Sequence, residues 1–292
     1  MENKLAKVSV QNLYTNVEFL TTVNPPRNFS NPAVLDKVAE FIYNKFENYG
    51  CRTSYQTYYI DGITYRNVIG SIGPEEGERI VIGAHYDVAG DQPGADDNAS
   101  AVAGLLESAR ILTLQEGELL QRIDFVAFTL EEPPYFGTSR MGSAVHAKSL
   151  HERGVEVKYM LCYEMIGYFS EEPGSQQFPY PELASKYPDK GNFITVVGIE
   201  KYYGLVEDFY TAMKKYGNLP IERIALPQAE GLAGMSDQRN FWRYGYPAIM
   251  INDTSFLRNP NYHLATDTID TLDFEKMAEV VNGVNGAVFF GV

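Results

Sequence analysis

The sequence is poor in the residues that mark several classes of protein. It has two cysteines in 292 residues, Cys51 and Cys162, too few for a disulfide framework or a thiolate metal site. Both lie in apolar, strand-like surroundings, so we expect buried thiols. No apolar run reaches the roughly 18 residues of a membrane span, and Met1 to Val10 lacks the apolar core of a signal peptide. The chain as written therefore predicts a cytoplasmic protein, and a periplasmic or secreted one if a leader has been removed.

Positive charge is also scarce in this chain. It has 24 lysines and arginines against 38 aspartates and glutamates, a net charge of −14. Nucleic acids and anionic membranes bind to basic patches, so we expect neither as a partner. Part of the acidic excess is instead available to bind cations.

The hydrophobic pattern alternates between strands and helices. We expect strands at 53–60, 65–72, 79–84, 123–130, 158–163, 192–199, 221–225 and 247–251, and helices at 2–23, 32–49, 99–114, 139–150, 203–216 and 272–290. A further short helix is expected after Ser236-Asp237, ending near Tyr244. Asp61-Gly62 predicts a hairpin and Asn31 a helix cap. The alternation predicts an α/β fold, with one domain over 1–292 and a central mixed, mostly parallel twisted sheet covered by helices on both faces.

One segment between expected elements is long. The polar stretch 170–191 contains four prolines and is longer than connections usually are in compact domains. We expect it to be functional, either as a lid over a site or as a contact to another subunit.

Side chains that bind metals follow several of the expected strands. They are His85 with Asp96, Glu131 with Glu132, Glu164, and His263 in a later loop. An imidazole and a carboxylate for each of two ions, with one carboxylate shared, suit zinc, whereas magnesium and calcium prefer oxygen ligands alone. The carboxyl ends of strands in open α/β sheets are where such sites form.

The spacing of these residues has a physical reason. In His85-Tyr86-Asp87, residues two apart on an extended segment point the same way, so Asp87 is expected to orient the His85 ring from behind. In Glu131-Glu132 the adjacent side chains diverge, so one can ligate a metal while the other acts as a base.

Four ordered motifs resemble one known family. His85-x-Asp87, Pro93-Gly94-Ala95-Asp96-Asp97-Asn98-Ala99-Ser100, Glu131-Glu132, and Tyr262-His263 with Asp267-Thr268 are similar to the co-catalytic zinc aminopeptidases, which include bacterial leucine aminopeptidases, glutamate carboxypeptidase and glutaminyl cyclase. The resemblance covers about residues 35 to 290. It implies a zinc-exopeptidase fold and two zinc ions, for which other divalent transition metals can substitute.

The resemblance also implies a role for each matched residue. His85 and Glu164 would bind one zinc, Asp96 would bridge, and Glu132 and His263 would bind the other zinc. Glu131 would be the general base and Tyr262 a hydrogen-bond donor to the oxyanion. A cis peptide would follow the bridging aspartate, at Asp96-Asp97. Asp97 itself is expected either to support the site from behind the ligands or to cap the helix that follows.

Two positions depart from the family pattern. Glu164-Met165-Ile166-Gly167 stands where the family has an aspartate first, and Pro133-Pro134-Tyr135-Phe136 replaces a glycine-rich loop after the glutamate pair. Both lie where the substrate binds, so we expect substrate preference to have changed. Ser236-Asp237 either supports the site or begins a helix.

We therefore expect a zinc-dependent exopeptidase, foremost an aminopeptidase that releases N-terminal residues from peptides or small amides through a metal-bridging hydroxide. The alternatives are carboxypeptidase-like cleavage, glutaminyl cyclisation at a single zinc, or a non-catalytic metal-binding protein. The first alternative requires a cation for the substrate carboxylate, for which Arg140, Arg239 and Arg243 are candidates. His146 and His151 are expected to be structural. No Gly-x-Ser-x-Gly is present, so a serine nucleophile on an elbow turn is excluded.

Overall fold

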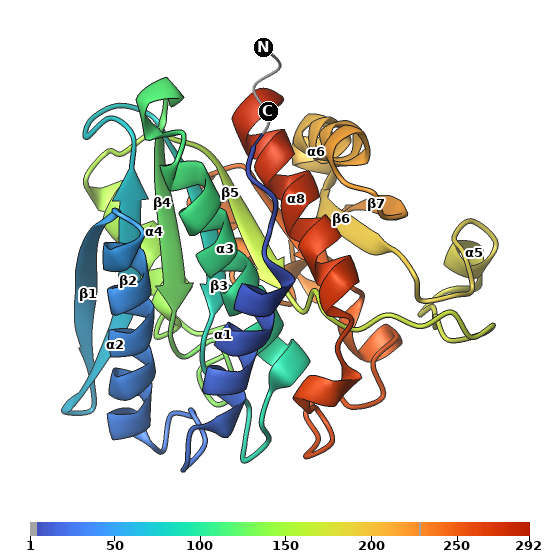
Figure 1. The fold of residues 1–292 in the computed structure, drawn as a ribbon, viewed down its shortest axis with the longest axis horizontal. Helices are drawn as coiled ribbons and strands as arrows, with labels where there is room; N and C mark the ends of the chain where they lie inside the picture. Colours follow the sequence, from blue (N-terminus) through green and yellow to red (C-terminus); the bar gives the residue numbers. More distant parts are fainter. Residues whose placement is uncertain (1–4, 228) are drawn as a thin grey trace.

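The computed structural model describes residues 5–227 and 229–292. Its eight strands form one sheet, in the order β1-β2-β4-β3-β5-β8-β6-β7 (Figure 1). The strands are β1 Arg52–Ile60, β2 Ile63–Ile72, β3 Arg79–His85, β4 Arg122–Phe128, β5 Val157–Glu164, β6 Ile194–Ile199, β7 Ile221–Leu226 and β8 Ala248–Asn252. β4, β3, β5 and β8 run parallel, as do β6 and β7, whereas β1 with β2, β2 with β4, and β8 with β6 are antiparallel. The predicted mixed, mostly parallel sheet is confirmed.

Helices cover both faces of this sheet. The helices are α1 Val10–Thr22, α2 Pro32–Asn48, α3 Ala101–Thr113, α4 Gly142–Glu152, α5 Pro181–Ala184, α6 Tyr203–Tyr216, α7 Gln238–Arg243 and α8 Phe274–Phe290. α1, α2, α3, α6 and α8 pack on one face and share its larger core, while α4 and α7 contribute to a smaller core on the other. β3 shows the alternation that this requires, because Ile80 and Ile82 lie in the larger core and Val81 in the smaller.

Local signals in the sequence account for most element boundaries. The Asp61-Gly62 turn joins β1 to β2 as predicted, with φ of 50° and 83°. Asn31 precedes α2 as predicted, but its side chain does not cap the helix; its Nδ2 donates to the Pro26 carbonyl and to Asn28 Oδ1 instead. The first helix begins at Val10, where the Ser9 hydroxyl accepts from the Asn12 amide, and residues 2–4 of the predicted helix lie outside the described residues.

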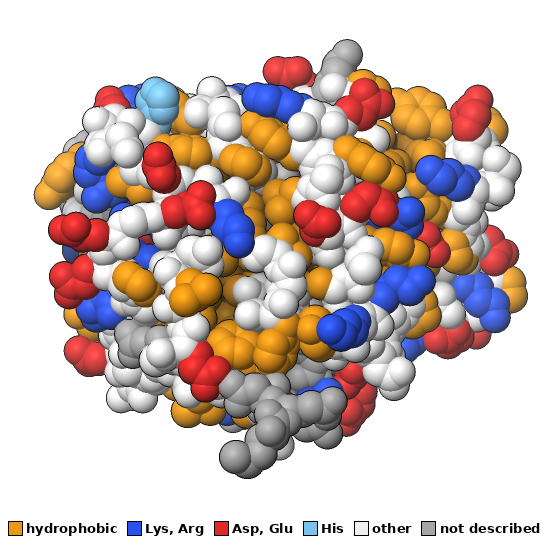
Figure 2. Space-filling view, turned by 90° about the horizontal axis from the view of Figure 1, so that it is seen from above, with side chains coloured by type: hydrophobic (Ala, Val, Ile, Leu, Met, Phe, Trp, Pro, Cys, Tyr) orange, Lys and Arg blue, Asp and Glu red, His pale blue; other side chains and the backbone are white. Residues whose placement is uncertain are grey.

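Two expectations drawn from composition can be compared with the structure. Cys51 and Cys162 are both buried and form no disulfide. Among the described residues, the helices are all too short or too polar to cross a bilayer. Figure 2 views the molecule from the end at which β4 and β5 begin, and acidic and basic side chains are interspersed over the face that it shows.

The strand order determines where functional groups can meet. β4, β3, β5 and β8 lie side by side and end at the same edge of the sheet (Figure 1). Residues that end or follow these strands are therefore brought together at that edge, although they are far apart in sequence. The stretch 170–191 leaves the end of β5 and contains the short helix α5, which stands out from the body of the molecule at the right of Figure 1.

Candidate metal centre

Two histidines and four carboxylates meet at this edge of the sheet. His85 is the last residue of β3, Glu164 the last of β5, and Glu131 and Glu132 follow β4. Asp97 comes from the irregular turn before α3, and His263 from the loop between β8 and α8. All are buried except His263, which is half-buried.

Asp97 lies between the two histidines. Its Oδ1 is 3.4 Å from His85 Nε2 and its Oδ2 is 3.0 Å from His263 Nε2. Glu164 Oε2 is 3.3 Å from His85 Nε2, and Glu132 Oε2 is 3.4 Å from His263 Nε2. The six contacting atoms thus form two groups, each with one imidazole and one glutamate, that share one aspartate. His85, Glu131 and Glu132 form a third group whose side-chain atoms are close enough to hold an ion.

The donor set fits two divalent ions. Tetrahedral zinc with bonds of about 2.0–2.1 Å places its ligand atoms roughly 3.3 Å apart, which matches the four separations. Two of these atoms, Asp97 Oδ1 and His263 Nε2, are buried without a hydrogen-bond partner among the described residues, as is the other carboxylate oxygen of Glu132, Oε1. Buried polar groups are rarely left in this state unless they bind water or an ion.

Asp97, and not Asp96, lies between the two histidines, so the geometry contradicts the prediction that Asp96 takes this position. The Asp96 carboxylate accepts from the Gly167 amide at 2.9 Å and from Asn259 Nδ2 at 2.7 Å, so both of its oxygens have protein donors. The Asp267 carboxylate accepts the amides of both Asp96 and Asp97 at 2.9 and 3.1 Å and so holds the backbone of this turn. This contact fixes the turn so that the two adjacent side chains diverge.

The same shift of one residue corrects two further expectations. The cis peptide bond is Asp97-Asn98 and not Asp96-Asp97. Asp97 also neither caps the following helix nor supports the site from behind its ligands. It has non-helical backbone angles, α3 begins only at Ala101, and the Asp97 carboxylate stands at the centre of the cluster.

Asp87 supports the glutamate pair more closely than the histidine. Its carboxylate accepts the amides of Glu131 and Glu132, each at 3.1 Å. Its Oδ1 is 3.6 Å from His85 Nδ1, longer than a normal hydrogen bond. Asp87 therefore makes no normal hydrogen bond to the His85 ring in this structure, and it chiefly fixes the turn after β4.

Glu131, unlike Asp97, does not lie between the two histidines. Its Oε2 is 3.9 Å from His85 Nε2, while the neighbouring Glu132 turns toward His263. The two adjacent side chains diverge as predicted. Burial raises the pKa of Glu131 well above its ordinary value, although the nearby His85 opposes the shift.

Glu164 is held by two residues whose part sequence reasoning did not define. The Ser236 hydroxyl donates to Glu164 Oε2 at 2.7 Å, and Asn98 Nδ2 donates to the same oxygen at 3.1 Å. Ser236-Asp237 was expected either to support the site or to begin a helix. Ser236 supports the site through Glu164, while Asp237 directly precedes α7 without capping it. A serine and an asparagine carry no signal of this kind in a sequence, because both are common in turns.

The electrostatics of the cluster reflect its excess of acids. Burial lowers the pKa of His85, but Glu164 and Glu131 outweigh it and raise that pKa well above its usual value. Burial likewise opposes the shift of His263, whose close contacts with the carboxylates of Asp97 and Glu132 raise its pKa to about 10. Burial raises the pKa of Glu132 to about 8. These shifts mark a site that favours additional positive charge.

Three non-glycine residues with left-handed backbones flank the cluster. Leu130, directly before Glu131, has φ 61°; Met165, directly after Glu164, has φ 44°; and His263 itself has φ 57°. Such conformations cost on the order of 1–3 kcal/mol each and concentrate at functional sites. They turn the chain sharply where each strand or loop delivers a ligand, and the sequence gives no sign of them.

Tyr262 lies against the cluster. Its ring stacks on that of His263, with centroids 3.8 Å apart and planes at 19°. Burial raises the pKa of the Tyr262 hydroxyl, and the carboxylates of Asp97 and Glu132 raise it further. The hydroxyl is therefore a proton-bearing hydrogen-bond donor at neutral pH.

The three candidate arginines make contacts away from the histidines. Arg140 Nη1 lies 2.9 Å from Asp61 Oδ2 in an exposed pair. Arg243 donates to the Gly137 carbonyl and to Asn240. The Arg239 guanidinium lies over the Phe136 ring, 4.8 Å from its centroid.

Comparison with known proteins places this geometry in a family. Residues 67–288 match the model of peptidase family M28. An uncharacterized protein of Escherichia coli K12, YfbL, is 43% identical over 284 residues, which cover 94% of this chain and 86% of YfbL. Probable leucine aminopeptidase 1 of Trichophyton verrucosum is 27% identical over 238 residues, which cover 76% of this chain and 57% of the relative. The chain thus spans little more than half the length of that aminopeptidase.

Solved structures share the fold at lower identity. The zinc aminopeptidase BSAP of Bacillus subtilis has a TM-score of 0.76 at 16% identity, over 98% of this chain and 96% of its own. The LapA aminopeptidase of Legionella pneumophila has a TM-score of 0.76 at 22% identity, over 96% and 71%. The glutaminyl cyclase of Bacteroides thetaiotaomicron has a TM-score of 0.73 at 21% identity, over 98% and 99%. These structures show a common fold, and the match of the family model over most of the sequence shows that this chain belongs to peptidase family M28.

Proposed function

We propose that this chain is an aminopeptidase that works with two divalent metal ions, for which zinc is the best fit. The observation that carries the proposal is the position of Asp97 between His85 and His263, with one further glutamate beside each histidine. A shared carboxylate with an imidazole on either side is the donor set of a two-metal hydrolytic site.

Each ion would have one histidine and one glutamate of its own and would share Asp97 with the other ion. His85, Asp97 and Glu164 would hold one ion, and Asp97, Glu132 and His263 the other. When bound, the ions polarise the scissile carbonyl and lower the pKa of water. They also reverse the electrostatics described above, because added positive charge favours the ionised carboxylates and the neutral histidines.

Glu131 is the proposed general base. Its carboxylate lies beside the histidines without taking either ligand position, so it is free to accept a proton from the attacking water. Asp87 fixes the backbone of Glu131 through its amide. The same carboxyl group can then deliver the proton to the amine that leaves.

Tyr262 is the proposed donor to the oxyanion that develops on the scissile carbonyl. Its ring is fixed by stacking on His263, and its raised pKa keeps the hydroxyl proton in place. A fixed donor of this kind stabilises charge that appears only in the transition state.

Two observations favour the aminopeptidase over the alternatives. A carboxypeptidase requires a cation for the substrate carboxylate, and Arg140 and Arg243 are engaged elsewhere while Arg239 lies on Phe136. A single-zinc cyclase requires only one of the two ligand groups, whereas both are complete here. Two similar proteins bear the names probable leucine aminopeptidase 1 and leucine aminopeptidase 1, which supports the same choice.

The test is hydrolysis of aminoacyl-p-nitroanilides, beside their N-acetylated forms, by protein loaded with two equivalents of zinc. We expect cleavage of the free-amine substrates only. Glu131→Gln should bind both zinc ions and lower kcat by roughly 10³-fold, since a general base contributes about 10²–10⁴-fold. Equal cleavage of the acetylated substrates, or none of either kind with two zinc ions bound, would contradict the proposal.

A further inference from the structure

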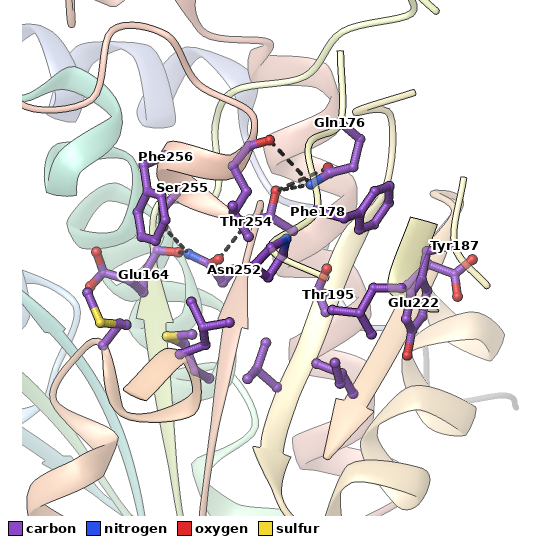
Figure 3. Close-up of a pocket in the computed structure, with 18 of the residues that line it drawn as sticks. Glu164, Gln176, Phe178, Tyr187, Thr195, Glu222, Asn252, Thr254, Ser255 and Phe256 are labelled. Atoms are coloured by element: carbon purple, nitrogen blue, oxygen red, sulfur yellow. Dashed lines mark hydrogen bonds between the residues drawn. The ribbon is translucent and has the colours of Figure 1, made fainter. Parts of the chain in front are cut away.

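An apolar pocket opens beside the metal centre (Figure 3). Its floor is the sheet face of β8, β6 and β7 that points away from α6 and α8, and part of its wall comes from Phe178, Leu183 and Tyr187 of the stretch 170–191. One end of the pocket is lined by Glu164 and Tyr262. The stretch 170–191 therefore forms part of a substrate-sized pocket that starts at the candidate metal site.

Four residues form a single row across this floor. Strand register pairs Glu164 with Asn252, Asn252 with Thr195, and Thr195 with Glu222. Neighbouring strands are about 4.8 Å apart, so the backbone of Thr195 lies roughly 10 Å, and that of Glu222 roughly 14 Å, from the backbone of Glu164. The row leads from a proposed metal ligand to a second carboxylate at the far end of the pocket, as Figure 3 shows.

The next row on the same face is apolar. It pairs Cys162 with Met250, Met250 with Val197, and Val197 with Ile224. All four side chains pack in the smaller core or against it. A ligand side chain in the pocket therefore meets hydrocarbon beside one line of polar groups.

Two members of the polar row have no hydrogen-bond or ion-pair partner for their side chains among residues 5–227 and 229–292. Asn252 Nδ2 donates to the Glu164 carbonyl at 2.7 Å, so Asn252 is engaged. Thr195 is 5% exposed, and its Oγ1 is buried without a hydrogen-bond partner in the described part of the chain. Glu222 makes no ion pair within 4.0 Å with a described residue. A buried hydroxyl and a carboxylate thus face the same end of an apolar pocket.

The basic side chains near Glu222 make other contacts. Arg223, the next residue along β7, points to the opposite face and pairs with Glu207. Lys214 donates to the Tyr210 hydroxyl, and Lys186 lies over the Tyr187 ring, 5.1 Å from its centroid. Partial burial raises the pKa of Glu222 above its ordinary value, while the positive charges of Arg223, Lys214 and Lys186 lower it. A further cation placed directly beside the carboxylate would favour its ionised form.

We propose that this pocket receives the side chain of the substrate's N-terminal residue, and that Thr195 and Glu222 select a long aliphatic side chain that ends in a cation, lysine or arginine. The methylene stem lies along the apolar row, as such stems do on protein surfaces. The cationic end donates to the Thr195 hydroxyl and to the Glu222 carboxylate. This inference rests on the proposed aminopeptidase function and adds its substrate class.

The first test compares lysine and norleucine p-nitroanilides with the zinc-loaded protein. Norleucine has the same carbon stem as lysine but no ammonium group. We expect kcat/KM to be about tenfold higher for lysine, as a hydrogen bond to a charged group provides. Glu222→Gln should remove most of that preference by slowing lysine cleavage alone, and Thr195→Val should reduce it by a few-fold. Unchanged norleucine cleavage shows that each variant is folded.

The matched control is Glu18→Gln, which makes the same change in net charge on the exposed side of α1. It should leave the ratio of lysine to norleucine cleavage unchanged. If norleucine and leucine substrates are cleaved but the ratio is near one, or the ratio is insensitive to Glu222→Gln, the inference is overturned while the aminopeptidase function stands.

A binding measurement separates this inference from the proposed function. Calorimetry on zinc-loaded Glu131→Gln should show lysinamide binding about tenfold more tightly than norleucinamide, and Glu222→Gln in the same background should remove the difference. If no p-nitroanilide is cleaved by the wild-type protein but this difference is found, cation selection by the pocket is supported and peptidase activity is not. Equal binding of the two amides overturns the inference.

Discussion

Two buried histidines of this protein lie in opposite surroundings. His85 is 1% exposed and His146 is 2% exposed. His146 packs against Phe128 and Phe241, its Nδ1 is 3.1 Å from Gln56 Oε1, and burial lowers its pKa to about 4. His85 is desolvated just as fully, yet the surrounding carboxylates raise its pKa. Burial alone therefore does not distinguish a metal ligand from a core residue, whereas unpaired carboxylates do.

Buried carboxylates show the same contrast. Asp124 is buried away from the metal centre, where the Ser71 hydroxyl donates to it at 2.6 Å and Arg79 at 2.9 Å. The protein thus supplies its own cation. At the metal centre, the ion-pair contacts of Asp97 and Glu132 with described residues are to histidines, and each carboxylate keeps an oxygen without a hydrogen-bond partner in the described part of the chain. The missing positive charge is what a metal ion provides.

The largest expected effect comes from replacing each histidine in turn. His85→Gln should lower kcat/KM on a free-amine substrate by roughly 10³-fold and reduce the zinc content, because several kcal/mol of transition-state stabilisation depend on the ions. His146→Gln should keep both zinc ions and change kcat/KM by only a few-fold. Comparable losses of kcat/KM and zinc in the two variants would contradict the assignment of His85 as a metal ligand and His146 as a core residue.

Removal of the metal should act on stability. With free zinc at a thousandfold its Kd, binding stabilises the folded state by about 4 kcal/mol per site, so a chelator should lower the unfolding midpoint markedly. Denaturant unfolding with zinc and with chelator measures the difference. Glu132→Gln should reduce the zinc-dependent part, and a wild-type midpoint that is insensitive to zinc would contradict the site.

The surroundings of His146 predict a pH effect of their own. Its folded pKa of about 4 lies below the unfolded value of about 6.5, so the unfolded state binds the proton more readily and stability is lost as the pH falls through 6.5. By pH 5 the loss should be about 2 kcal/mol. Urea unfolding at pH 7 and pH 5 should show this extra loss in the wild type but not in His146→Gln.

The smallest effect is expected at the surface. Arg140→Ala removes an exposed pair with Asp61 and should change the free energy of unfolding by less than about 1 kcal/mol. It should leave cleavage of free-amine substrates unchanged. A loss of activity confined to substrates with a free carboxylate would instead assign Arg140 to substrate binding and favour the carboxypeptidase reading.

Much of the fold could be predicted because its signals are local. The buried strands that end at His85 and Glu164 are continuous apolar runs, and the hairpin at Asp61-Gly62 depends on residues adjacent in sequence. Five of the six clustered residues follow directly from such strands and from the motif that contains His263. Their roles as ligands and base remain proposals.

What the sequence could not show depends on distant contacts. The turn that carries Asp96 and Asp97 is held by Asp267, which is 170 residues or more away along the chain. The row from Glu164 to Glu222 exists only because β6 lies antiparallel beside β8, an order that no local pattern encodes. The sequence therefore predicted the strands and the residues at their ends, but not which side chains face the cluster or how distant strands lie beside one another.

The most direct test of the account is the zinc content of the wild-type protein, Asp97→Asn and Asp96→Asn, measured by elemental analysis after equilibration with zinc and removal of the excess. We predict two zinc ions per chain in the wild type and in Asp96→Asn, and at most one in Asp97→Asn. Two ions in Asp97→Asn together with a loss in Asp96→Asn would contradict the two-metal centre described here.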